Sequence, residues 1–98
     1  MCQIKKGANM KNYYSTVDGI ILTFSDIEEN NGFDEITVRF ERPDGHGFDF
    51  AEGKLPNNMF YKCSGFSDDE LLELEMYLKN NSFLIWEIAR EKGGVTVA

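Results

Sequence analysis

The sequence is poor in cysteine, proline and histidine, with two, two and one in 98 residues. Cys2 and Cys63 lie far apart and form no CxxC pair, so neither a disulfide framework nor an ordinary zinc site is indicated. The apolar runs at residues 20–22 and 83–86 are too short to span a bilayer. Because the first residues also lack the apolar stretch of a secretion signal, we expect a cytoplasmic protein with no membrane contact.

Basic residues are outnumbered, with 10 Lys and Arg against 17 Asp and Glu and a net charge of −7. Binding to a nucleic-acid backbone needs a surplus of cations, so we expect no direct nucleic-acid contact. Hydrophobic residues make up 42% of the chain, which is enough to build a core. We interpret residues 1–98 as one domain, in which the lysine-containing, acid-free residues 1–11 form a flexible basic arm.

From residue 12 the chain alternates in the manner of a strand. Asp18-Gly19 is a two-residue hairpin signal, because both residue types tolerate positive φ. Such a turn places Val17 opposite Ile20 and continues to Tyr13 opposite Phe24. The turn and the hydrophobic pattern agree on this pairing.

The next turn lies at Asn30-Asn31-Gly32 and leaves two registers open. A two-residue loop sets Phe24 opposite Arg39, which puts an apolar residue beside a charged one. A three-residue loop sets Phe24 opposite Val38, so we prefer it.

Later turn signals extend the sheet. Residues 42–45 have the composition of a turn, and residues 47–52 of a fourth strand with Phe48 and Phe50 on one face. Residues 59–63 are left open as a short fifth strand. The sequence predicts a β-meander over residues 12–54.

Residues 67–92 have helical periodicity. Ser67 and Glu70 fit a capping box, and Leu71, Leu74 and Leu78 define one helical face. The three polar residues at 80–82 weaken a helix, so we expect two helices, with one kinked helix as the alternative. The predicted fold is α+β: an antiparallel meander of about four strands, followed by two C-terminal helices on one sheet face.

One short pattern suggests catalysis. Pro43-Asp44, followed by Glu52-Gly53-Lys54, resembles the PD-(D/E)xK nuclease motif. The resemblance implies that Asp44 and Glu52 hold a divalent metal and that Lys54 positions water. Residues 43–45 are also fully explained as a turn, and the net charge repels DNA. We therefore predict no catalytic residue, no metal and no cofactor, and keep a metal-dependent nuclease as a third alternative.

Carboxylates are concentrated around the second hairpin. The group consists of Asp26, Glu28, Glu29, Asp34 and Glu35. A calcium loop would need a different spacing. Such a group is either a solvated hairpin end or a docking site for a basic partner. The second interpretation is physically reasonable because carboxylates on a rigid hairpin imitate phosphates and speed encounter with a basic surface. A second group at residues 68–73 is explained by the helix dipole.

These features predict a small, acidic, non-enzymatic interaction protein that blocks or escorts a basic partner protein. The inhibitor, antitoxin and immunity types fit, including a phage-encoded inhibitor of a nuclease. The alternative is a small-ligand-binding or oligomer-forming domain, with a pocket beside Phe60 and Phe66 or a homodimer through surplus apolar helix surface.

Overall fold

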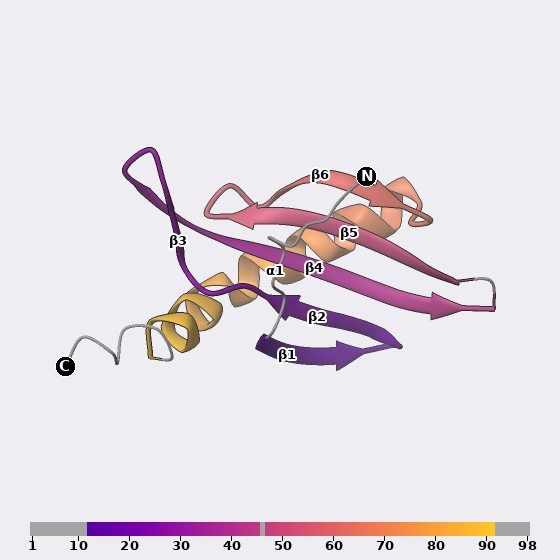
Figure 1. Cartoon of the computed structure of the whole chain (residues 1–98). Coiled ribbons are helices and arrows are strands. Elements are labelled where there is room, and N and C mark those ends of the chain that lie inside the picture. The colour runs from indigo at the N-terminus through magenta and orange to yellow at the C-terminus, as the bar shows by residue number, and fades with distance from the viewer. Residues whose placement is uncertain (1–11, 46, 92–98) are drawn as a thin grey trace.

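The computed structural model describes residues 12–45 and 47–91, which form an antiparallel sheet with a long helix across it (Figure 1). The elements in chain order are β1 (Asn12–Val17), β2 (Ile20–Phe24), β3 (Glu28–Asn30), β4 (Phe33–Asp44), β5 (Gly47–Leu55), β6 (Met59–Ser64) and α1 (Asp68–Ala89). The sheet order is β1-β2-β4-β5-β6, and β3 pairs with β4 off this path.

The predicted α+β class is confirmed, and two details are corrected. The described chain has six strands instead of about four, and one C-terminal helix instead of two. The basic arm predicted at residues 1–11 and the end of the helical segment at residue 92 lie outside the described residues. None of the described helical residues makes a segment long and apolar enough to cross a membrane.

The turn between β1 and β2 has the predicted form. Asp18 and Gly19 have φ values of 54° and 78°, as a type I′ turn requires. Val17 lies opposite Ile20, in agreement with the sequence pattern.

The far end of β1 departs from the predicted pairing. A β-bulge between Tyr13 and Ser15 adds one residue to β1, so Asn12 lies opposite Phe24 in place of Tyr13. The ring of Tyr14 packs edge-to-face with that of Phe24, with 6.4 Å between the centroids. The bulge therefore brings Tyr14 to the core side and leaves Tyr13 exposed.

The register between β2 and β4 is the predicted one, with Phe24 opposite Val38. The three-residue loop that was predicted to set this register is wrong. β3 and β4 join through a two-residue turn, Asn31-Gly32, with φ values of 57° and 86°. The pairing of β3 with β4 and the pairing of β2 with β4 differ in register by one residue, and this shift occurs between β2 and β3. There Ser25 N–H donates to the Thr37 carbonyl at 2.9 Å, and Ser25 Oγ accepts from Thr37 N–H at 3.0 Å.

The turn predicted at residues 42–45 lies further along the chain. β4 continues through Asp44, which lies opposite Gly47. Pro43 is tolerated inside the strand because the pairing of β4 with β2 ends at Glu41, so only one neighbouring strand remains at that point.

The strand left open at residues 59–63 exists as β6, which pairs with β5 through a bulge after Glu52. The adjoining Gly53 permits a close approach of β6. A Cβ at Gly53 would lie 2.5 Å from the carbonyl oxygen of Met59.

The start of α1 confirms the capping box. Ser67 Oγ accepts from the Glu70 N–H at 3.2 Å, and Glu70 Oε1 accepts from the Ser67 N–H at 2.8 Å. Both bonds satisfy backbone donors that a free helix end leaves unpaired.

The break predicted at residues 80–82 is wrong, because α1 runs through them. Asn81 Nδ2 donates to the Tyr77 carbonyl, and Asn81 Oδ1 accepts from the Tyr14 hydroxyl, each at 2.7 Å. Its side chain is therefore satisfied without opening the helix, whereas a free asparagine competes for backbone bonds.

The core lies between the sheet and α1. Its fully buried members include Leu22, Phe24, Ile36, Val38, Phe40 and Leu55 from the sheet and Leu78 and Ile85 from α1. Ile36, Val38 and Phe40 face inward as predicted. The alternation of β4 then places its intervening residues on the other side of the sheet.

Candidate functional site

The face of the sheet opposite α1, here called the open face, is covered by no helix of the described chain (Figure 1). Its side chains from β4 and β5 are Thr37, Arg39, Glu41, Phe48, Phe50, Glu52 and Lys54. The prediction that Phe48 and Phe50 share one face is confirmed by their ring contact, at 6.2 Å between centroids.

Arg39 lies at the centre of the open face. Its Nη1 donates to Glu52 Oε1 at 2.8 Å, and its Nε donates to Glu41 Oε2 at 2.6 Å. The guanidinium carbon lies over the ring of Phe50 at 4.5 Å and that of Phe48 at 5.7 Å. Arg39 therefore combines charge pairing with cation–π contact.

The second oxygen of Glu52 is also occupied. Tyr61 Oη donates to Glu52 Oε2 at 2.7 Å. Burial raises the pKa of Tyr61, and its hydrogen bond to Glu52 raises this pKa further, so the hydroxyl stays protonated. Arg39, Glu52 and Tyr61 together form a satisfied polar network that holds the open face rigid.

The nuclease pattern does not form a site in this fold. Glu52 and Lys54 lie on the open face, where Lys54 pairs with Glu35 at 3.2 Å. Asp44 lies eight residues from Glu52 in sequence, and the alternation of β4 puts it on the opposite face. The described residues contain no group of three His, Cys, Asp or Glu that could hold a metal ion.

The predicted partner-binding carboxylates gather on the β3–β4 hairpin. Glu28 lies opposite Glu35, and Glu29 lies opposite Asp34. Residues directly opposite on antiparallel strands have Cβ atoms about 4.5–5.5 Å apart, so like charges there repel. The hairpin thus carries two like-charged pairs, and it projects beyond the other strands (Figure 1).

The two pairs differ in their surroundings. Glu28 accepts a weak hydrogen bond from Thr37 Oγ1 at 3.4 Å, and Glu35 pairs with Lys54. Glu29 and Asp34 are exposed and make no hydrogen bond or ion pair within residues 12–45 and 47–91.

The fifth predicted carboxylate, Asp26, does not lie on the hairpin. It precedes β3 in the break where the register changes, and its Oδ1 accepts from Asn12 Nδ2 at 3.1 Å. Asp26 therefore helps to hold the end of β1, which is a structural contact.

Phe33, at the hairpin tip, is a further candidate residue that the sequence pattern did not single out. It follows the turn directly, lies opposite Asn30 and is 72% exposed. The available signal was its odd-numbered position, which it shares with Glu35 and Arg39 on the outward face of β4.

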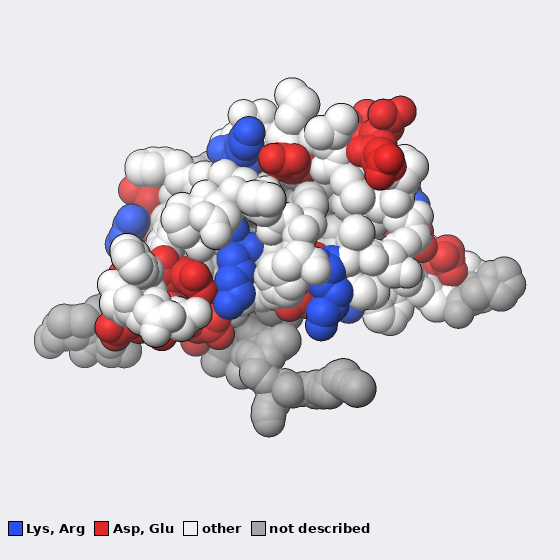
Figure 2. Space-filling view, turned by 90° about the horizontal axis from the view of Figure 1, so that it is seen from above, with Lys and Arg blue, Asp and Glu red and all other residues white. Residues whose placement is uncertain are grey.

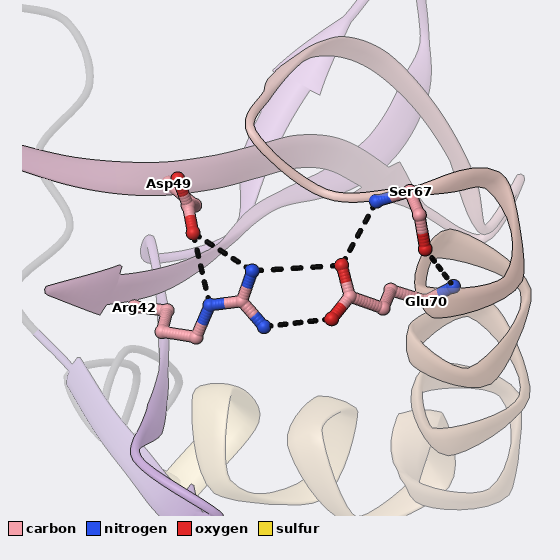
Figure 3. Close-up of polar contacts among 4 residues, drawn as sticks. All are labelled: Arg42, Asp49, Ser67 and Glu70. Atoms are coloured by element: carbon pink, nitrogen blue, oxygen red, sulfur yellow. Dashed lines mark hydrogen bonds and ion pairs between the residues drawn. The ribbon is translucent and has the colours of Figure 1, made fainter. Parts of the chain in front are cut away.

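The second acidic group surrounds the start of α1. Arg42 joins this group to the sheet, because its guanidinium bonds both Asp49 on β5 and Glu70 on α1 (Figure 3). The hydrogen bond from Arg42 lowers the pKa of Glu70 to about 2. Arg42 also stacks on Phe66 at 4.6 Å.

The two acidic groups lie at different ends of the molecule. Figure 2 shows one gathering of acidic side chains over the β3–β4 hairpin and another over the start of α1, with basic side chains between them. Glu35 and Arg42 are seven residues apart on β4, which is roughly 23 Å of extended strand. Within the described residues, Arg42 pairs with the group at the start of α1, whereas the hairpin group pairs with Lys54 through Glu35.

Phe60 and Phe66, the residues beside which a pocket was predicted, lie in different surroundings. Phe60 packs edge-to-face against the core ring of Phe40 at 5.8 Å, and Phe66 lies under Arg42.

Comparison of the chain with protein-family models, curated proteins and solved structures found no match.

Proposed function

We propose that this protein is a non-enzymatic interaction protein that binds a basic partner protein through its β3–β4 hairpin. The observation that carries the proposal is the pairing of like charges, Glu28 with Glu35 and Glu29 with Asp34, beside the exposed Phe33. This arrangement costs stability in the free protein, and cations from a partner would relieve it.

Glu29 and Asp34 provide the electrostatic part of the interaction. Being exposed and without a cation in the described chain, they steer a basic surface toward the hairpin and keep their charge free for it. A nuclease or another nucleic-acid-binding protein is the class of partner that fits, because its phosphate-binding surface is basic. Binding there would block that surface.

Phe33 provides the apolar part. Energetic hot spots of interfaces are large side chains surrounded by a polar rim, and Phe33 has this setting among carboxylates. The base of the hairpin is held by the Lys54–Glu35 pair and by the Ser25–Thr37 bonds. A hairpin fixed in this way loses little entropy on binding.

Charge reversal at the hairpin tests the proposal. The variant Glu29→Lys/Asp34→Lys and the control Glu87→Lys/Glu91→Lys change the net charge equally, and the control residues are exposed and lie outside the hairpin. Each protein is immobilised and exposed to a lysate of the source organism at about 0.1 M and about 0.5 M salt. The distance over which salt screens charges differs about twofold between these two concentrations. Retained proteins are identified and quantified by mass spectrometry.

We expect a basic protein that the wild type and the control retain at low salt and that the hairpin variant loses. With that protein purified, Phe33→Ala should weaken binding at least tenfold by calorimetry, because an anchor at a hot spot contributes about 2 kcal/mol. If every retained protein binds the hairpin variant as well as the control, the proposal is wrong.

A further inference from the structure

A cavity of about 170 Å³ lies between the β1–β2 hairpin and the first half of α1. It is far from the β3–β4 hairpin, because the β1–β2 turn and the start of α1 both lie toward the Arg42 end of β4. A ligand bound there would act independently of the hairpin.

The inner wall of the cavity is apolar. Ile20 of β2, Phe40 of β4 and Leu74 of α1 contribute to it, and the ring of Tyr77 lies edge-to-face with Phe40 at 6.3 Å. An apolar cavity of about 150 Å³ holds one benzene molecule, so this cavity matches a single aromatic ring. It is too small for a drug-sized ligand, whose pockets have about 300–1,000 Å³.

The cavity also has two carboxylates on its lining, one from each side. Asp18 comes from the β1–β2 turn, and Glu73 comes from α1. Both are exposed, and within residues 12–45 and 47–91 neither makes a hydrogen bond or an ion pair. The polar group on the same lining, Tyr77 Oη, is already paired with Ser15 Oγ at 2.9 Å.

We propose that this cavity binds a small aromatic amine, with its ring against Phe40 and Leu74 and its ammonium group at Asp18 and Glu73. The ring matches the size and apolarity of the wall, and the ammonium group supplies the cation that both carboxylates lack. The aromatic walls favour a neighbouring cation as well. This inference does not depend on the proposed function of the hairpin.

The test uses benzylamine as the probe, with benzyl alcohol as its neutral match and benzoate as its anionic match. Each is titrated to about 10 mM into the ¹⁵N-labelled full chain, a range suited to millimolar affinity. We expect benzylamine to give saturable amide shifts in residues 15–20 and 73–77. Benzyl alcohol should bind at least about fivefold more weakly, because it lacks the charge-assisted contacts, and benzoate should not bind.

Two variants measure how much each carboxylate contributes to benzylamine binding. Glu73→Gln and Asp18→Asn should each weaken benzylamine binding about threefold or more, whereas Glu87→Gln, on the same helix but outside the cavity, should leave it unchanged. Asparagine is accepted at the first position of a type I′ turn, so Asp18→Asn keeps the backbone.

Three outcomes would overturn the proposal: no saturable shifts with benzylamine, equal affinity for benzyl alcohol, or shifts that map to the β3–β4 hairpin. The Glu29→Lys/Asp34→Lys variant separates the two proposals, because it should abolish partner capture and leave benzylamine shifts in residues 15–20 and 73–77 intact.

Discussion

At the scale of single residues, two arginines of β4 organise much of the paired charge. Arg39 lies on the open face with Glu41 and Glu52, and Arg42 points to the helix side with Asp49 and Glu70. Their odd and even positions in one strand send them to opposite faces. One strand thus serves both a surface network and the joint between sheet and helix.

The joint at Arg42 predicts a pH dependence of stability. The pKa of Glu70 falls from an ordinary 4.5 to about 2 in the folded chain, mainly through its hydrogen bond with Arg42. A lowered folded pKa adds stability above about pH 4.5, and this addition is lost as the pH falls from 4.5 toward 2. Glu70→Gln, which still fits a capping box, should therefore flatten the decrease of unfolding free energy in that window.

Urea denaturation at intervals between pH 2 and pH 6 measures this effect. Glu87→Gln removes a carboxylate from an exposed part of the same helix and serves as the control. An equal pH slope for both variants would contradict the role assigned to Arg42.

The Arg39 network predicts a large loss of stability when one partner is removed. Glu52 is only 7% exposed, so Arg39→Met leaves a buried carboxylate without its cation, which costs about 3–5 kcal/mol. The double variant Arg39→Met/Glu52→Met removes both charges and should recover most of that loss, measured by urea denaturation. A double variant no more stable than Arg39→Met would show that the contact is not the cause.

At the scale of elements, the register of the sheet is accompanied by three local irregularities. The bulge after Tyr13, the break at Ser25 and the bulge at Gly53 each move a strand by one position. The predicted pairing of Phe24 with Val38 is nevertheless correct, because a one-residue slip would expose the whole apolar set of β2. Burial therefore decided the register, and the backbone adjusted to it.

The close approach of β6 to β5 predicts a contrast between two glycines. A Cβ at Gly53 would meet the Met59 carbonyl oxygen at 2.5 Å, whereas at Gly45 it would meet nothing within 4 Å. Gly53→Ala should lower the unfolding free energy by about 1–3 kcal/mol through overpacking. Gly45→Ala should change it by less than about 0.5 kcal/mol, as expected for an open surface position. Thermal and urea denaturation compare them, and equal effects would contradict the account of β6.

At the scale of the whole molecule, the net charge of −7 is unevenly neutralised. The acids around Arg39 and Arg42 are paired with cations, whereas the exposed Glu29 and Asp34 are not within the described chain. The hairpin thus carries uncompensated charge at a projecting end of the described chain, and Asp18 and Glu73 carry more of it at the cavity.

This distribution predicts that function and stability oppose each other at the hairpin. Glu29→Lys turns a like-charged cross-strand pair with Asp34 into an opposite-charged one and should raise the unfolding free energy by about 0.2–1 kcal/mol. The same change should weaken capture of the basic partner. Urea denaturation at low and high salt measures the gain, which should shrink at high salt. A loss of stability would contradict the repulsion on which the proposed function rests.

The features of this protein that the sequence predicts are those that depend on residues close together in the chain. The Asp18-Gly19 turn, the capping box at Ser67 and the inward face of β4 were predictable, because each depends on residues close together in the chain. The hairpin carboxylates were predictable as a group, except for Asp26. The alternation of β4 places Phe33 on the outward face, but it does not distinguish an exposed aromatic residue that binds a partner from one that does not.

The sequence by itself determined the α+β class, the acidic charge, the Asp18-Gly19 turn and the start of the helix, because local backbone preferences and apolar periodicity act over a few residues. The tertiary structure alone decided the continuity of α1, where Tyr14 bonds Asn81 across 67 positions in the chain. It also decided the separation of the two acidic groups and the cavity under the β1–β2 hairpin. These features depend on which distant side chains meet, and only the packing of helix on sheet sets that.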